Sequence, residues 1–443
     1  MLKHIFNPKT IALIGASNRP KTVGSGIASN LLKSNKKIFF VNPNRKKIFN
    51  KKTYASISDI EEKIDLAIIA VPSKIVNMVA RECAAKKVKG MIVISAGFSE
   101  IGNIKEEEEL KKIAKEANIS LIGPNCLGII NTKVNLNASF APFVPKKGNI
   151  ALLSQSGAIL DSIIDTARYE NYGFSKIVSF GNEAGLDLSD YLDYLANDKD
   201  TDVITMYLEG IKNGRKFLKV ASRVSKIKPV IVLKSGKSKL GKSAALTHTG
   251  SLAGDSKIYS SVFKQANVIE VDSIEELLDL SKVLSWNSRC KNGVGIVSNG
   301  GGFGVLAVDY FENEKIKIPK LKKETLNFLN DPQFDKVKTR NNPLDIMGDA
   351  LASRYEIAIE SLLKQNNIYC ILVIQGLQIM TEPEKTAKII VKLRNKYNKP
   401  IIVSFVGGDS FKKAISIVEK NRIPNIIEIK RAVKVIKHLI YEK

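Results

Sequence analysis

Short apolar runs alternate with longer amphipathic stretches along almost the whole chain. Residues 11–14, 66–71 and 91–94 are examples of such runs, and the stretches between them carry apolar side chains at helical spacing. Short apolar runs bounded by turn residues are typical of buried strands. Strands that alternate with helices form parallel sheets with crossover helices. The pattern therefore predicts an α/β protein built from parallel sheets.

Two breaks in this pattern predict where the domains meet. Residues 135–148 contain several Pro and Gly residues and show no period, and residues 287–293 follow a long helical stretch. A chain of 443 residues is expected to hold roughly three domains of about 150 residues each. We therefore expect domains at residues 1–134, 149–287 and 293–443, with residues 135–148 as a linker.

In the first domain, each predicted strand ends in residues that favour loops, such as Gly15, Pro43, Pro72 and Gly97. Ligands of open α/β sheets bind at the carboxyl ends of the strands. These loops therefore predict a ligand site at that edge, although each loop alone is equally consistent with ordinary turn chemistry. The loop after Gly15 does not spell GxGxxG, so a nicotinamide cofactor is not favoured.

The second and third domains each begin with a strand that leads through small residues into a helix. Ser156 and Gly157 open the helix in the second domain, and residues 299–302 (NGGG) open it in the third. A helix N-terminus offers free N–H groups and roughly +0.5 charge to an anion. Each segment therefore predicts a phosphate site, while Ser156 is also consistent with a simple helix cap. Residues 302–307 match the dinucleotide pattern GxGxxA only weakly.

His248 is the strongest catalytic candidate among the three histidines. It lies in AALTHTGSLAG, among small and hydroxyl residues that would let a phosphate approach the imidazole. The segment is equally consistent with an ordinary surface histidine. Glu209 follows a strand of the same predicted sheet and could fix the tautomer of His248 through a hydrogen bond. Glu209 could instead be an acidic residue at a helix N-terminus.

Residues 236–243 spell a literal GxxxxGK[ST] after a strand, which raises the possibility of a nucleotide-binding P-loop. A P-loop opens directly into a helix, whereas Thr247, Thr249 and Gly250 interrupt helical pattern in the residues that follow. We also find no apolar strand ending in an Asp that would hold the metal of such a site. The segment is better explained as a flexible approach to His248, and the P-loop remains an alternative.

The net charge of +25 comes from lysines that are spread along the whole chain. No basic arm and no aromatic platform interleaved with arginine is present, so we expect no nucleic-acid binding. No run approaches the ~20 apolar residues of a membrane span, and the start of the chain does not resemble a signal peptide. The four cysteines lack metal-ligand spacing. We therefore expect a cytoplasmic protein with free thiols, no metal of its own and no membrane contact.

Taken in order, these motifs resemble those of the alpha subunits of ADP-forming acyl-CoA synthetases (acetate–CoA ligases), in the succinyl-CoA synthetase superfamily. The resemblance covers nearly the whole chain, and the ordered set is specific although no single motif is. It implies an N-terminal Rossmann-like CoA-binding domain followed by two flavodoxin-like domains. The motifs that carry it are GASNRP, SAGFSEIG, IGPNCLGIIN, SQSGAILD, GNEAGLD, LEGIKNGRKF, THTGSLAG, NGGGFGVL and NPLDIMGDA.

The same resemblance implies roles for particular residues. His248 would be the phosphohistidine and Glu209 its orienting carboxylate. The phosphate would lie at two helix N-termini, formed by Ser156, Gly157, Asn299, Gly300, Gly301 and Gly302. Asn125 would lie near the acyl and phosphate groups. Coenzyme A would contact Gly15, Ala16, Ser17, Asn18, Arg45, Ser95, Ala96, Gly97 and Asn125, the match at Arg45 being only approximate.

The implied reaction converts acyl-CoA, ADP and phosphate into a carboxylic acid, ATP and CoA through an acyl phosphate and phospho-His248. We find no segment that resembles the ATP-grasp domains of the single-chain relatives. The resemblance therefore implies a separate ATP-grasp beta subunit, in an α2β2 assembly, that binds ADP or ATP with Mg²⁺. A non-catalytic CoA-binding regulator is a further alternative. The sequence does not determine which small carboxylic acid is the substrate.

Overall fold

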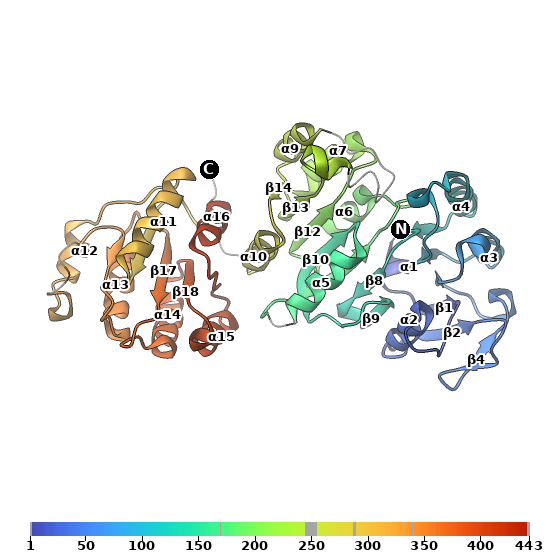
Figure 1. The fold of residues 1–443 in the computed structure, drawn as a ribbon, viewed down its shortest axis with the longest axis horizontal. Helices are drawn as coiled ribbons and strands as arrows, with labels where there is room; N and C mark the ends of the chain where they lie inside the picture. Colours follow the sequence, from blue (N-terminus) through green and yellow to red (C-terminus); the bar gives the residue numbers. More distant parts are fainter. Residues whose placement is uncertain are drawn as a thin grey trace. The chain divides into compact units, whose positions relative to one another are not determined.

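The computed structural model describes residues 2–168, 170–243, 255–286, 289–335, 337 and 340–440. The chain divides into two compact units, Met1–Leu277 and Leu278–Lys443. The first runs from blue to green in Figure 1 and the second from yellow to red.

The first unit begins with a sheet of seven strands in the order β3-β4-β2-β1-β5-β6-β7. All neighbouring strands pair in parallel except β3 and β4, which form an antiparallel pair. Every residue of β5 and β6 is buried, as expected for parallel strands that helices cover on both faces. The strands are β1 (Thr10–Ile14), β2 (Lys37–Val41), β3 (Lys47–Ile48), β4 (Lys51–Tyr54), β5 (Leu66–Ile69), β6 (Gly90–Val93) and β7 (Ser120–Ile122).

The crossover helices of this sheet follow the expected amphipathic pattern. In α3 (Ser73–Ala85) the buried residues are Val76, Val79, Ala80 and Cys83, which recur at the spacing of one helix face. The other helices of this part are α1 (Lys3–Phe6), α2 (Val23–Leu31) and α4 (Ile104–Glu116).

The second sheet of the first unit also has seven strands, in the order β14-β13-β12-β10-β11-β8-β9. Strands β10 to β14 are parallel, whereas β8 pairs with β11, and β9 with β8, in antiparallel fashion. The strands are β8 (Gly128–Asn131), β9 (Leu136–Ser139), β10 (Lys147–Ser154), β11 (Phe174–Ser179), β12 (Val203–Leu208), β13 (Val230–Lys234) and β14 (Ile269–Val271). The helices are α5 (Gly157–Ala167), α6 (Leu188–Ala196), α7 (Gly214–Val224), α9 (Ser256–Gln265) and, at the boundary of the units, α10 (Ile274–Ser285).

Residues 135–148, which we expected to be a linker, contain β9 and the first residues of β10. Strand β9 looks polar in sequence, but its Asn137 and Ser139 are buried and the Ser139 hydroxyl donates to Asn137 Oδ1 over 2.6 Å. The β9 edge is also held by α2, because Asn30 Nδ2 donates to the carbonyl oxygens of Ser139 and Ala141, each at 3.0 Å. Strands β8 and β9 therefore join the first sheet's helices to the second sheet.

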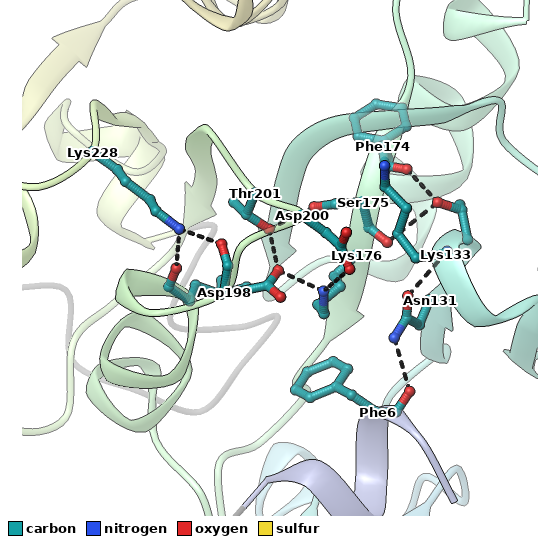
Figure 2. A network of polar contacts seen from close by, with 12 residues as sticks. Phe6, Asn131, Lys133, Phe174, Ser175, Lys176, Asp198, Asp200, Thr201 and Lys228 are labelled. Atoms are coloured by element: carbon teal, nitrogen blue, oxygen red, sulfur yellow. Dashed lines mark hydrogen bonds and ion pairs between the residues drawn. The ribbon is translucent and has the colours of Figure 1, made fainter.

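A buried polar network stabilises the second sheet near the start of strand β11 (Figure 2). Lys176 on β11 is only 2 % exposed, and its ammonium donates to Asp198 over 2.5 Å. Asp198 also accepts from the Thr201 hydroxyl over 2.6 Å. In the same view, Asn131 Nδ2 on β8 donates to the carbonyl oxygen of Phe6 over 2.9 Å, a further link between the N-terminal helix and the second sheet.

The second unit contains a parallel sheet of four strands in the order β16-β15-β17-β18. A buried ion pair, Lys282 to Glu419 at 2.7 Å, fastens the C-terminal half of α10 to α15. The strands are β15 (Val294–Ser298), β16 (Leu344–Asp345), β17 (Cys370–Gly376) and β18 (Ile401–Val406). The helices are α11 (Gly301–Asn313), α12 (Lys323–Phe328), α13 (Ala352–Lys364), α14 (Pro383–Tyr397), α15 (Lys412–Lys420) and α16 (Ile429–Leu439).

The α/β class with mainly parallel sheets is confirmed. The four cysteines are buried free thiols. In the part of the chain that the structure describes, none of the helices has the length and apolar character that crossing a membrane requires.

Candidate functional site

The carboxyl edge of the first sheet requires glycine at its first loop. Gly15 follows β1 with φ +88°, and a Cβ at this position would lie 2.2 Å from the carbonyl oxygen of Ala70. The next residue, Ala16, is buried, and its carbonyl oxygen accepts from Asn42 Nδ2 over 2.8 Å. Ser17 Oγ accepts from the Arg19 N–H over 3.0 Å, which closes the turn. The loop over residues 15–18 is therefore tightly built against the ends of β2 and β5.

The loops after β6 and β7 lie beside each other at this edge. Ser95 Oγ donates to the carbonyl oxygen of Val71 over 2.5 Å, and the Ser95 carbonyl oxygen accepts from the Asn125 N–H over 2.9 Å. The N–H groups of Gly97 and Phe98 donate to the carboxylate of Glu100. This acceptor uses N–H groups that an anionic ligand could otherwise have taken, so Gly97 is a less open anion site than its sequence suggests.

A cavity of about 550 Å³ connects this edge to the start of α5. Its lining includes Ser95, Ala96 and Asn125 from the first sheet and Gly157 from the helix N-terminus. The structure therefore brings predicted CoA residues and a predicted phosphate residue to one cavity. Residues 15–18 and the exposed Arg45 belong to the same sheet edge but are not among the described residues that line this cavity.

A second cavity, of about 410 Å³, shares Asn125 with the first. Glu209 lines this second cavity together with Gln155, which directly precedes the cap of α5, and with Asn182 and Glu183 from the loop after β11. The shared Asn125 has φ +58°, and its Nδ2 donates to Asn182 Oδ1 over 3.2 Å. The two cavities together place predicted CoA, phosphate and catalytic residues around Asn125.

Glu209 is held in place through its main chain. Its N–H and that of Gly210 donate to Gln155 Oε1, the second over 3.0 Å. Its carbonyl oxygen accepts from Lys234 Nζ over 2.8 Å. Burial lowers the pKa of Lys234, whose ammonium also lies 4.6 Å from the ring centroid of Tyr259. The backbone at Glu209 is thus fixed by two side chains, Gln155 from the loop after β10 and Lys234 at the end of β13.

His248 lies within residues 244–254, outside the residues that the structure describes. Its predicted pairing with Glu209 stays a prediction. In the segment that leads to it, residues 239–243 are helical, and Lys237 forms ion pairs with Glu270 at 2.8 Å and Asp272 at 3.0 Å.

The two predicted phosphate helices begin in the same way. At α5, Ser154 Oγ donates to the carbonyl oxygen of Ser156 over 2.7 Å and accepts from its N–H over 3.1 Å. At α11, Ser298 Oγ makes the same two contacts with Gly300, at 2.9 and 3.2 Å. A serine at the end of the strand therefore fixes the turn that leads into each helix.

The residue after each serine ties its turn to the next parallel strand. Gln155 accepts from the two N–H groups after β12, and Asn299 exchanges two hydrogen bonds with Gly376 at the end of β17, at 2.8 and 2.9 Å. Both ends of the Asn299 amide are thereby used, so its side chain serves the backbone.

The start of α11 also differs from α5 in charge. A Cβ on Gly301 would lie 2.9 Å from Asp345 Oδ2, which places a carboxylate against the first turn of α11. That carboxylate already complements the positive end of the helix. At α5 the acceptor near the first turn is the Ser156 hydroxyl, which accepts from the Ile159 N–H over 3.4 Å, so Ser156 acts as the cap of this helix.

Gln155, Asn182 and Glu183 are site residues to which the sequence reasoning gave no role. Asn182 Nδ2 donates to Glu107 Oε2 over 2.8 Å and to Ser99 Oγ over 3.2 Å. Burial raises the pKa of Glu183 to about 7, and its carboxylate accepts from the Leu188 N–H over 2.8 Å. The motifs SQSG and GNEAG contained these residues, but only the fold shows that they meet at one cavity.

The fold and this site define the chain as a CoA-binding α/β protein of the ligase type. Residues 9–132 match a family model described as a CoA binding domain, and residues 147–284 match one described as a succinyl-CoA ligase like flavodoxin domain.

Known proteins with similar sequences and structures identify the family within this class. The chain is 46 % identical, over 99 % of its length, to the acetate–CoA ligase [ADP-forming] of Methanocaldococcus jannaschii, and covers 63 % of that protein. It is 41 % identical to subunit alpha of acetate–CoA ligase [ADP-forming] II of Pyrococcus furiosus, with 96 % of this chain and 94 % of the relative covered. A solved structure of a dinucleotide forming acetyl-coenzyme A synthetase 1 from Ca. Korarchaeum cryptofilum, in complex with phosphate and ADP, matches with a TM-score of 0.93 and 38 % identity, over 99 % of this chain and 96 % of that one. The chain belongs to the family of ADP-forming acetate–CoA ligases.

Proposed function

We propose that this chain is the alpha subunit of an ADP-forming acyl-CoA synthetase. The complete enzyme, with its partner subunit, would interconvert acyl-CoA, ADP and phosphate with a carboxylic acid, ATP and CoA. The observation that carries the proposal is the pair of cavities that share Asn125. One cavity joins the loops of the CoA-binding sheet to Gly157 at the start of α5, and the other holds Glu209.

In the first step, an oxygen of inorganic phosphate attacks the thioester carbon. The carbon–sulfur bond breaks, CoA leaves and takes up a proton, and an acyl phosphate remains. The N–H groups at the start of α5 stabilise the phosphate charge there, because they are already oriented before the charge develops. We assign this role to Ser156 and Gly157, with residues 299–302 supplying the second helix N-terminus.

In the second step, a ring nitrogen of His248 attacks the phosphorus of the acyl phosphate. The bond from phosphorus to the acyl oxygen breaks and the carboxylate leaves. Glu209 holds the other ring nitrogen and thereby keeps the attacking nitrogen unprotonated. The phosphoryl group then passes to ADP.

The nucleotide site belongs to a partner in this proposal. The Pyrococcus furiosus relative that matches the chain over almost its full length is itself named a subunit alpha, and the chain spans about two thirds (63 %) of the Methanocaldococcus jannaschii relative. We assign ADP or ATP with Mg²⁺ to an ATP-grasp beta subunit in an α2β2 assembly, and coenzyme A to residues 15–18, Arg45, residues 95–97 and Asn125 of this chain. Mg²⁺ would neutralise the charge of the nucleotide phosphates there.

Two alternatives make different predictions. A P-loop enzyme that used Lys242 and Ser243 would bind ATP tightly without a partner, but the GxxxxGK[ST] segment lies inside the ligase-like match over residues 147–284. A non-catalytic CoA-binding regulator would bind CoA without taking up phosphate at His248.

The test is phosphorylation of the full chain by labelled acetyl phosphate. We expect an acid-labile phosphate on His248, located by mass spectrometry. His248→Ala should abolish the label and leave CoA binding unchanged, and Glu209→Gln should slow labelling by about a hundredfold or more, since it removes the carboxylate that orients the base.

His4→Ala is the matched control, because His4 is exposed on α1. It should label like the wild type. Retained labelling of His248→Ala would refute the proposed function, and an unchanged rate in Glu209→Gln would remove Glu209 from the site.

A further inference from the structure

Asp161 is a carboxyl group that the mechanism above does not use. It lies in the second turn of α5, four residues after Gly157, and lines the 550 Å³ cavity. Its Oδ1 atom is buried and has no hydrogen-bond partner in the described part of the chain. Because the two oxygens of a carboxylate are equivalent acceptors, the second oxygen of Asp161 is the one that a ligand in this cavity would meet.

The described residues around Asp161 provide no hydrogen-bond donor to its Oδ1 atom. Most of the cavity wall around it is apolar and includes Val71, Ile94 and Phe140. Burial accordingly raises the pKa of Asp161 to about 6. Cys126 is the other titratable side chain among the described residues of the wall, and burial raises the pKa of its thiol to about 12, so it stays neutral.

The neighbouring acid on the same helix is in a different situation. Asp165, one turn further along α5, is 49 % exposed and pairs with Arg168 at 3.0 Å. Of these two acids, Asp161 is therefore the one with a buried carboxyl oxygen that lacks a partner in the described part of the chain, and it is the one that lines the cavity.

We propose that Asp161 accepts a hydrogen bond from the pantetheine arm of bound CoA, through one of its N–H or O–H groups. This inference rests on the proposed function, because it takes the cavity as part of the CoA site. A phosphate group is not the partner that we assign to Asp161, because a carboxylate offers it no hydrogen-bond donor. The phosphate of the proposed function is held instead by the N–H groups of Ser156 and Gly157. The pantetheine arm is uncharged, largely apolar and carries two amide N–H groups and a hydroxyl, which matches an apolar cavity with one free acceptor.

Such a contact couples CoA binding to protonation. A donor bonded to the carboxylate favours its ionised form and lowers the pKa of Asp161 from its value of about 6 in the free protein. Between pH 5 and 7 the complex therefore holds fewer protons than the free chain, and binding releases protons. Affinity should accordingly rise as the pH increases through this window.

The test is calorimetric titration of the full chain with 3′-dephospho-CoA at pH 5–8, in two buffers of different ionisation enthalpy. This probe lacks the phosphate monoester of CoA that would itself titrate in this range. We expect the wild type to bind with proton release and to gain roughly tenfold in affinity between pH 5 and 7. Asp161→Asn should bind at pH 7 about fivefold to tenfold more weakly and without this pH dependence. Asp165→Asn should behave like the wild type.

A second variant separates ligand recognition from folding. Asp161→Leu removes a half-buried carboxyl group whose Oδ1 atom has no partner among the described residues, so it should raise the melting temperature of the ligand-free chain at pH 7 while weakening the binding of dephospho-CoA. Equal affinity and equal proton release in the wild type and both Asp161 variants would overturn the inference and leave the proposed function intact. If His248 takes up no phosphate but the Asp161 dependence is observed, the proposed function fails and this inference stands.

Discussion

Burial raises the pKa of two carboxyl groups that line the cavities, Asp161 and Glu183. Glu183 has φ +53°, is 7 % exposed, and has a pKa raised to about 7 from its ordinary value of 4.5. A group whose pKa is higher in the folded protein stabilises the fold below its unfolded pKa, and this contribution disappears as the pH rises through the folded pKa. For Glu183 the window therefore runs from about pH 4.5 to about pH 7.

We expect Glu183→Gln to be more stable than the wild type at pH 8 and equal to it near pH 4. Glutamine keeps the oxygen that accepts from the Leu188 N–H but carries no charge to be desolvated. Urea unfolding of both proteins from pH 4 to pH 8 measures the difference.

Glu116→Gln is the control for this prediction, because Glu116 is 67 % exposed and lies 3.9 Å from its lysine neighbour. It should leave the pH profile unchanged. Parallel profiles for Glu183→Gln and the wild type would contradict the assignment.

At the scale of elements, one unit of strand, turn and helix occurs twice in the chain. In β10–α5 and in β15–α11, a serine at the strand end bridges the turn and the following amide side chain bonds to the end of the next strand. Gln155 connects this unit to Glu209, so the position of Glu209 depends on a side chain from another strand.

Gln155→Leu should therefore affect both stability and phosphorylation. It leaves two backbone N–H groups without their acceptor, which costs about 1–3 kcal/mol of unfolding free energy for each group that stays unpaired. We also expect labelling of His248 to slow at least tenfold, because the turn that carries Glu209 is no longer fixed.

Gln265→Leu provides the comparison, since Gln265 is an exposed residue at the end of α9. It should change neither quantity. If Gln155→Leu lowers stability but leaves the labelling rate unchanged, Gln155 has only a structural role.

The apolar pattern predicted the elements that the site depends on, for a physical reason. Strands β1, β5 and β15 and the second half of β10 are buried on both faces, so their sequences are apolar runs, which end in Gly, Pro or Ser. Strand β9 was missed because Asn137 and Ser139 look like loop residues in sequence. In the fold both are buried, and the carbonyl oxygen of Ser139 accepts from Asn30, 109 residues away. The roles of Gln155 and Asn182 were missed for the same reason, since their partners lie 54 and 75 residues away.

At the scale of the whole molecule, the two compact units have separate hydrophobic cores. One core cluster runs from Leu2 to Val268, and another runs from Val297 to Ile423. Each unit also contains a buried ion pair of its own, Lys176–Asp198 in the first and Lys282–Glu419 in the second. Chains with separate cores commonly unfold in more than one step.

We expect two transitions in calorimetry, each sensitive to one of these pairs. Lys176→Met should lower the stability of the first unit alone, and Lys282→Met that of the second alone. Each change leaves a buried carboxylate unpaired and should cost about 3–5 kcal/mol.

Lys37→Met tests the role of burial, because Lys37 is 58 % exposed and pairs with Glu62 at the surface. It should change the unfolding free energy of neither unit by more than about 1 kcal/mol. A single transition that both buried variants shift equally would contradict the division into two folding units.

The antiparallel pair β8–β9 has a consequence for how the protein can be dissected. A fragment that stops at residue 134 would lack β9, leave the Asn30 amide without the two carbonyl oxygens it bonds, and uncover the adjoining face of α2. We therefore expect the CoA-binding domain to be less stable when the chain is cut at residue 134 than within the first compact unit. Genetic truncations aimed at isolating it should retain the chain as far as residue 277, the end of the first compact unit.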